Sequence, residues 1–203
     1  RQRRVRLEAE QIRDAALCAS GLLSQKMLGP GVYPPQPKGI YVVTQVAKAW
    51  PESQGDDRYR RGLYTYFWRS SPYPMLPTFD APDANGVCTR RNRSNTPLQA
   101  LTILNDSVFQ EIAQHMAKEY AKSTKSVDDK IVDVWKRCLS RSPNAEEITT
   151  LRDFFNKNAE RFAKLPKDAA VLAGPGDGDP VQRAAWTATI RVVFNLDEMV
   201  TKE

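Results

Sequence analysis

Histidine and cysteine are scarce in this 203-residue sequence, which contains one histidine and three cysteines. Cys18, Cys88 and Cys138 lie far apart, and neither a CxxC pair nor a CxxCH motif occurs. A zinc finger, and a c-type haem held by this chain alone, are therefore excluded, because both need closely spaced cysteine and histidine. We predict that this chain binds no cofactor and no metal, and that His115 is a surface or half-buried residue of a helix.

The sequence also lacks long apolar runs and phosphate-binding loops. No run approaches the ~20 apolar residues of a membrane-spanning helix. Neither a GxGxxG nor a Walker motif is present, so nothing supports nucleotide binding. The net charge of +6 would favour polyanions, but the 30 basic residues are mixed with 24 acidic ones. No basic stripe alternates with stacking aromatics, and we predict no nucleic-acid partner and no membrane span.

The sequence does contain apolar residues at helical spacing and residues that cap helices. Thr96 with Pro97 and Gln99 is typical of a capped helix start, and Asp106 can cap a second helix in the same stretch. Ser126 with Asp129, and Asn144 with Glu147, mark two further starts. The predicted helices run from about Arg4 to Ser20 (with Gly21 as the stop), from Thr96 to Lys122 with Leu101 and Leu104 on its apolar face, from Ser126 to before Pro143, from Asn144 through Phe162, and from Val181 to Asp197.

The fold class expected is mainly α, an irregular helical bundle with a long Pro-rich and Arg-rich loop region and at most a short strand or hairpin. We predict one domain over 1–203, a fragment of a longer protein, with a helix and long irregular loops over 1–95 and half of a helical bundle over 96–203. Ile40 to Val46 is β-prone, and Asp57 to Ser70 fits a short helix with Leu63 on its apolar side. Cys18 and Cys138 are predicted to be buried among apolar neighbours.

The segment from Phe79 to Asp106 is the candidate functional region, because long connections without regular structure are uncommon unless they have a function. Arg90, Arg91 and Arg93 precede a helix N-terminus, whose free N–H groups favour anions. They are candidates for binding a carboxylate or sulfate. Alternatively, they bind Asp80, Asp83 or helix C-termini and hold the loop in place.

Asp80 and Asp83 are the candidate acid and base of an enzyme site, or ligands of a hard cation. They can equally accept hydrogen bonds from their own turn, as aspartates do in Asx turns. The remaining candidates for anion or substrate binding are Gln99, Asn105 and Trp68.

Four blocks of sequence resemble a known family: RLEAEQIRDAALCASGLL, YRRGLYTYFWRSSPYPML, TFDAPDANGVCTRRNRSNTPLQALTILND and AAWTATIRVVFNLDEMVTKE. The family is the C-terminal domain of unknown function, number fifteen fifty-three, of large planctomycete proteins, often downstream of a cytochrome c module. The resemblance implies an extracytoplasmic, periplasmic or secreted protein. It also implies that a c-type haem, if present, is held by an upstream domain, and that this domain is a partner of the chain.

The resemblance implies no reaction, so three functions stay open. The first is an accessory or substrate-facing module of a secreted redox protein, with an anionic or carbohydrate ligand. The second is an enzyme domain acting on polysaccharide or another secreted substrate. The third is a structural or assembly protein, in which the Pro-rich arm from Gly29 to Pro37 wraps a neighbour.

Overall fold

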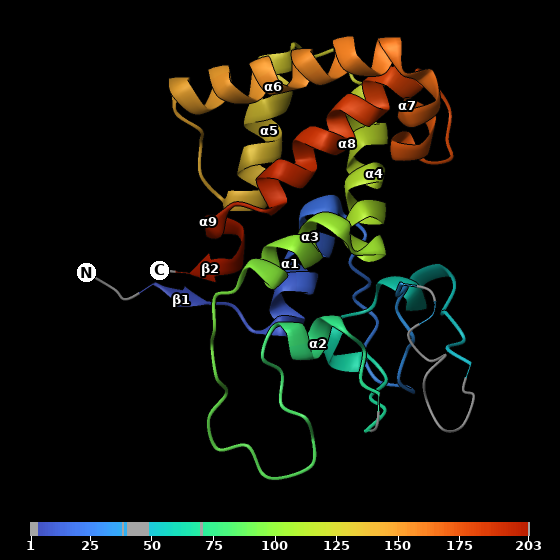
Figure 1. The fold of residues 1–203 in the computed structure, drawn as a ribbon, viewed down its shortest axis with the longest axis vertical. Coiled ribbons are helices and arrows are strands. Elements are labelled where there is room, and N and C mark those ends of the chain that lie inside the picture. Colours follow the sequence, from blue (N-terminus) through green and yellow to red (C-terminus); the bar gives the residue numbers. More distant parts are fainter. Residues whose placement is uncertain (1–3, 38, 40–48, 70, 203) are drawn as a thin grey trace. The chain divides into compact units, whose positions relative to one another are not determined.

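The computed structural model describes residues 4–37, 39, 49–69 and 71–202, and Figure 1 shows its elements. The chain divides into two compact units. Unit 1 comprises Arg1–Phe109 and Val200–Glu203, and unit 2 comprises Gln110–Met199. The mainly α class is confirmed, and the strands of the described residues are one antiparallel pair. The strand predicted at 40–46 lies outside the described residues.

Unit 1 begins with a short strand, β1 (Val5–Arg6), which pairs with β2 (Thr201–Lys202). The first helix, α1 (Ala9–Ser20), therefore starts later than predicted, because the residues before it pair with β2 instead. Glu8 opens the helix, and its N–H donates to Gln11 Oε1 at 3.1 Å. The predicted stop is confirmed: Gly21 has φ 78°, a left-handed conformation that costs glycine little.

The helix α3 (Pro97–Asn105) starts where the capping box predicts it. The N–H of Thr96 donates to Gln99 Oε1 at 3.3 Å. Leu101, placed on the apolar face by its spacing, is instead 52% exposed, and Leu104 is only partly buried. Asp106 accepts a hydrogen bond from the N–H of Val108 at 2.9 Å and opens α4 (Ser107–Lys122), as predicted.

The prediction of a short helix over residues 57–70 was wrong. That segment contains two 3-10 turns, η1 (Gly55–Tyr59) and η2 (Gly62–Tyr64), followed by extended chain. A Cβ at Gly62 would lie 2.9 Å from Glu10, so the close approach of α1 requires glycine here. The N–H of Tyr66 donates to Val32 O at 2.7 Å, a bond that a helix would not make. Leu63 is 69% exposed rather than buried.

Unit 2 is built of regular helices with well-formed caps. Ser126 Oγ accepts from the N–H of Asp129 at 3.1 Å, and Asn144 Oδ1 accepts from the N–H of Glu147 at 2.8 Å, so both predicted starts are confirmed. A short helix after 165 was not predicted. Unit 2 contains most of α4, followed by α5 (Val127–Leu139), α6 (Ala145–Lys164), α7 (Pro166–Ala173), α8 (Pro180–Phe194) and α9 (Asp197–Val200).

The core of unit 2 forms around α8. Trp186 is 1% exposed, and its ring centroid lies 4.5 Å from that of Phe155 and 5.5 Å from that of Tyr120. The predicted helix is nevertheless divided, because α8 ends at Phe194 and α9 begins at Asp197.

The cysteines differ from one another in their surroundings. Cys18 is exposed, so the prediction that it is buried was wrong: the buried face of α1 contains its neighbours Leu17 and Ala19. Cys138 is half-buried, and burial raises the pKa of its thiol to about 12. His115 is exposed on α4, as its predicted surface position requires.

Candidate anion-binding site

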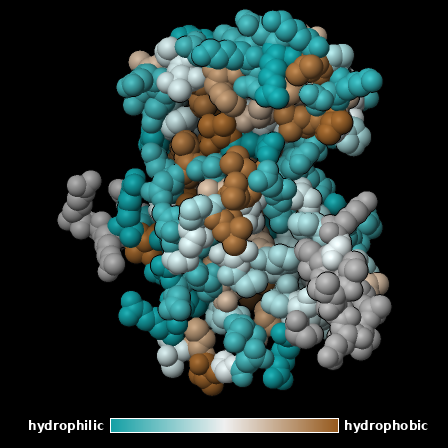
Figure 2. Space-filling view, viewed as in Figure 1, coloured by the Kyte–Doolittle hydropathy of each residue, from teal (hydrophilic) through white to brown (hydrophobic). Residues whose placement is uncertain are grey.

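A pocket of about 720 Å³ lies within unit 1, between the segment before α1 and the loop that leads to α3. Arginine is its most frequent lining residue, and Glu8 is the carboxylate among the lining residues. Figure 2 shows hydrophilic residues beside a smaller hydrophobic group at the lower end of the view, where this loop lies. The lining residues are Arg4, Val5, Arg6, Glu8, Cys88, Thr89, Arg90, Arg91, Asn92, Arg93, Ser94 and Asn95.

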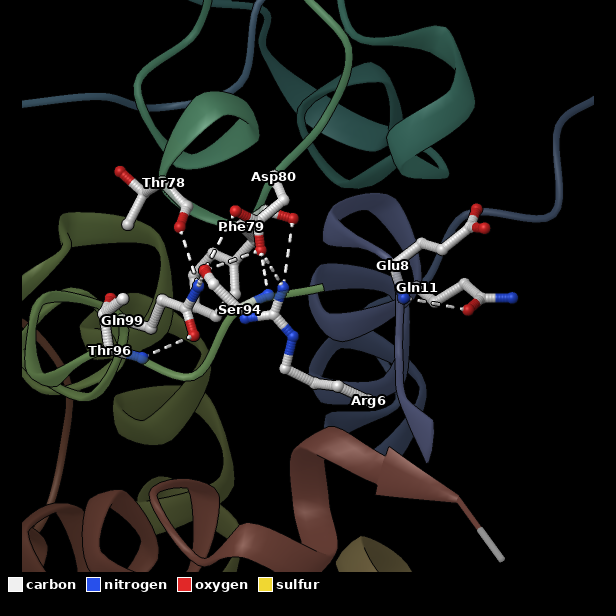
Figure 3. A network of polar contacts seen from close by, with 9 residues as sticks. All are labelled: Arg6, Glu8, Gln11, Thr78, Phe79, Asp80, Ser94, Thr96 and Gln99. Carbon is white, nitrogen blue, oxygen red and sulfur yellow. Dashed lines mark hydrogen bonds and ion pairs between the residues drawn. The ribbon is translucent and has the colours of Figure 1, made fainter. Parts of the chain in front are cut away.

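Asp80 anchors one wall of this pocket without lining it (Figure 3). Its carboxylate accepts from Arg6 Nη2 at 2.5 Å, from the N–H of Ser94 at 2.8 Å and from Ser94 Oγ at 2.9 Å. Burial opposes ionisation, but the hydrogen bonds from Ser94 and Arg6 outweigh it and lower the pKa of Asp80 below its ordinary value. Both carboxylate oxygens thus accept hydrogen bonds, an arrangement that ties the loop to Arg6.

Gln99 completes the same network from the first turn of α3. Its Nε2 donates to Thr78 O at 3.0 Å and to Ser94 Oγ at 3.2 Å, while its Oε1 accepts from Thr96. The side chain is 4% exposed. Gln99 therefore supports the pocket from behind and is not placed to contact a ligand.

The arginines of the loop differ in how strongly they are neutralised. Arg91 pairs with Glu10 through two bonds of 2.8 and 3.2 Å and reaches Glu8 at 3.1 Å. The hydrogen bond to Glu10 raises the pKa of Arg91 above its ordinary value. Arg93 lies 3.9 Å from Glu8 and is 44% exposed. Arg90 is exposed and forms no ion pair with the described part of the chain.

Asp83 is not brought together with Asp80 in the pocket. It is exposed, and it accepts from the N–H of Asn85 at 3.0 Å in a local Asx turn. The hydrogen bonds from Asn85 lower the pKa of its carboxyl below the ordinary value. Asp83 therefore bonds its own turn, as the alternative interpretation describes, whereas Asp80 is bound by Arg6 and Ser94. Among the described residues, Arg91 and Arg93 pair with Glu8 and Glu10 and not with either aspartate.

A family model described as "Protein of unknown function (DUF1553)" matches residues 1–155. The chain belongs to this family. The match includes the whole pocket and ends within α6, so α7, α8 and α9 lie beyond it. No curated protein and no solved structure matches this DUF1553 chain.

Two predicted site residues of the DUF1553 chain lie away from the pocket. Trp68 is part of a group of aromatic rings, 5.8 Å from Trp50 and 6.1 Å from Tyr66 between centroids. Asn105 lines a smaller, mainly apolar cavity of about 290 Å³ next to α3, together with Leu101. Neither contributes to the arginine-lined site.

Arg4, Arg6 and Glu8 are pocket residues that sequence reasoning missed. The expected helix over 4–20 included Arg6 and Glu8 but gave them no part in the candidate site. The signal that was available is the Val5-Arg6 dipeptide before the Glu8 to Gln11 capping box, which favours a helix starting at Ala9.

No group of three or more histidine, cysteine, aspartate or glutamate residues in the described part of the DUF1553 chain is arranged to hold a metal ion. None of the helices described is long and apolar enough to cross a membrane.

Proposed function

We propose that this DUF1553 chain is an accessory, substrate-facing module that binds an anionic ligand in its arginine-lined pocket. The exposed guanidinium of Arg90, with no carboxylate partner among the described residues, is the observation that carries the proposal. An arginine with no internal partner, beside others that are paired, is suited to bind a carboxylate or sulfate through two parallel hydrogen bonds.

The way in which the pocket is built supports this function. Arg6 and Arg91 are neutralised by Asp80 and by Glu10, and these pairs hold the two walls in place. The positive charge left for a ligand comes from Arg90 and from Arg93, whose nearest carboxylate oxygen is 3.9 Å away. A wall held in place by ion pairs, with exposed arginines beside it, binds an anion with little loss of conformational entropy.

The cellular setting is a second part of the proposal and rests on the family resemblance. We propose an extracytoplasmic location, either periplasmic or secreted, and an association with a c-type cytochrome domain upstream in the same planctomycete protein. The haem then belongs to that domain. The visible spectrum of the full-length protein tests this: a covalent c-type haem band is expected, and its absence would contradict the association.

Titration calorimetry with dextran sulfate tests the pocket. Removal of Arg90 deletes a charge-assisted hydrogen bond worth about 1.5–3 kcal/mol, so Arg90→Ala is expected to weaken binding by roughly 10- to 100-fold. Arg152→Ala is the matched control, because Arg152 pairs with Asp128 at 2.7 Å in unit 2, which contributes no residue to the pocket lining. Equal affinity for the wild type and Arg90→Ala would overturn the proposal.

The module is expected to bind without turnover. Hydrolysis of a polysaccharide by the purified chain would instead favour the enzyme hypothesis. Loss of that activity in Asp80→Asn and Asp83→Asn, without a lower melting temperature, would assign them as acid and base.

A further inference from the structure

The extended chain after η2 presents aromatic side chains in alternation. Tyr66 and Trp68 are two residues apart in a segment that pairs with Val32, and alternate residues of an extended chain point to the same side. The alternation was hidden at the sequence level by the helical interpretation of residues 57–70. It places both rings on one face of unit 1.

Two more rings, from distant parts of unit 1, complete a closed cycle with this pair. Tyr33 stacks on Tyr66 with centroids 4.8 Å apart, and Trp50 meets Tyr33 edge to face at 5.0 Å. Trp68 is perpendicular to both Trp50, at 5.8 Å, and Tyr66, at 6.1 Å. Each ring therefore contacts two others, in geometries that the quadrupole of an aromatic ring favours. We call these four residues the aromatic platform.

Backbone and side-chain hydrogen bonds hold the platform rigidly. The N–H of Tyr33 donates to Ser53 Oγ at 3.0 Å, and Trp50 Nε1 donates to Pro34 O at 2.6 Å. The N–H of Tyr66 donates to Val32 O at 2.7 Å. The polar group of Trp50 is satisfied internally, so that ring acts as an apolar surface with a fixed orientation.

The platform has an inner and an outer side. Tyr73 lies on the inner side: it stacks on Trp50 at 6.0 Å, is fully buried and donates its hydroxyl hydrogen to Pro35 O. The platform rings themselves are not fully buried. Tyr66 is 39% exposed, and Tyr33, Trp50 and Trp68 are partly exposed. Arg69, which follows Trp68, is exposed, and its Nε donates to Asn85 Oδ1 at 3.2 Å.

We propose that the aromatic platform is a binding site for neutral oligosaccharides. A sugar ring presents C–H groups on its faces, so it fits a fixed, partly exposed aromatic surface. Rigid aromatic side chains offer a large contact area at a small entropic cost. The site uses no residue of the arginine-lined pocket and does not depend on the function proposed for it.

Intrinsic tryptophan fluorescence of the full chain, titrated separately with cellohexaose, xylohexaose and mannohexaose, tests the site. At least one of the three is expected to bind saturably. Trp68→Ala is expected to weaken that binding about tenfold, since one ring contact is worth ~0.5–1.5 kcal/mol beyond its buried area. Trp68→Phe retains a ring and should recover most of the affinity. Leu63→Ala, at an exposed residue outside the platform, should leave it unchanged.

Saturation-transfer NMR keeps the test valid if Trp68→Ala does not fold. Irradiation of the aromatic protons of wild type should transfer magnetisation to the bound sugar, and Trp68→Phe should retain the effect. Two results would overturn the proposal. One is that none of the three hexaoses binds saturably up to about 10 mM, a concentration that would detect millimolar affinity. The other is that Trp68→Ala leaves the binding unchanged. Arg90→Ala should weaken the binding of dextran sulfate but not that of any neutral hexaose, so the two proposals are tested independently.

Discussion

The two units of this chain differ in how the hydrogen bonds of their backbone N–H and C=O groups are formed. In unit 2, regular helices bond their own backbone, side-chain caps close their first turns, and Trp186 fills the core. In unit 1, the described chain between α1 and α3 includes α2 (Met75–Thr78) and two 3-10 turns, so most carbonyls there have no helical partner.

Buried arginines take the place of regular structure in unit 1. Arg60 is 1% exposed and donates to the carbonyls of Leu28 at 2.5 Å, Pro30 at 3.1 Å and Lys26 at 3.4 Å. Arg13, also 1% exposed, donates to the carbonyl of Arg60 at 2.6 Å. A guanidinium has five donors in a fixed plane, so one side chain can satisfy several carbonyls of an irregular loop. The Pro-rich arm is therefore held within its own unit.

The largest expected effect is in the apolar core of unit 2. Trp186→Ala removes a ring that packs on Phe155 and Tyr120, and the cavity should lower the free energy of unfolding by about 3–5 kcal/mol. Urea denaturation followed by circular dichroism measures it. A loss below ~1 kcal/mol would show that the helices of unit 2 are not held by this core.

Arg60→Met is the corresponding change in unit 1. It keeps much of the apolar volume but leaves three carbonyls without their donor, and we expect a loss of about 3 kcal/mol. Limited proteolysis should then cut within residues 22–37 first. Arg60→Lys is the control for charge. The ammonium group of lysine cannot reproduce the planar, forked donors of a guanidinium, so this variant should recover little of the lost stability. Full rescue by lysine would contradict the role given to the guanidinium.

Asp80→Asn tests the link between Arg6 and the loop. Loss of the charge-assisted bonds from Arg6 and Ser94 should cost about 1–3 kcal/mol at pH 7, measured by thermal and urea unfolding. Because the folded pKa of Asp80 is lowered, its contribution is present above the unfolded pKa near 3.9 and is lost as pH falls through the folded value. The difference between wild type and variant should therefore shrink below about pH 4.

Asp83→Asn is the matched control for that experiment. Asp83 is exposed and bonds only its local turn among the described residues, so the melting temperature should hardly change. Equal destabilisation by the two substitutions would remove the distinction between an anchoring aspartate and a turn aspartate.

The smallest expected effect is at a helix cap of unit 2. Asn144→Ala removes the acceptor of the Glu147 N–H and should cost about 1 kcal/mol in thermal unfolding. Asn156→Ala, at an exposed position inside the same helix, should be neutral or slightly stabilising, because alanine is the better helix former. An equal loss at both positions would argue against a specific capping effect.

The sequence predicts well the features that depend on neighbouring residues. The caps at Thr96, Ser126 and Asn144 each join residues three apart, and all three helices start as predicted. The pocket instead depends on partners far apart in sequence: Arg6 with Asp80, and Arg91 with Glu10. Spacing within a single sequence does not reveal such pairs. Leu63 shows the same limit, since it is 69% exposed while Arg60, in the same segment, is 1% exposed.

The pairing of β1 with β2 also affects how the protein is made. The N–H of Leu7 donates to Val200 O at 2.8 Å, so unit 1 closes with residues that follow all of unit 2 in the sequence. A ribosome synthesises unit 2 before β2 exists, which takes on the order of ten seconds at typical rates. During that time β1 has no strand partner, and it is then that a nascent chain is most open to a chaperone or to mispairing.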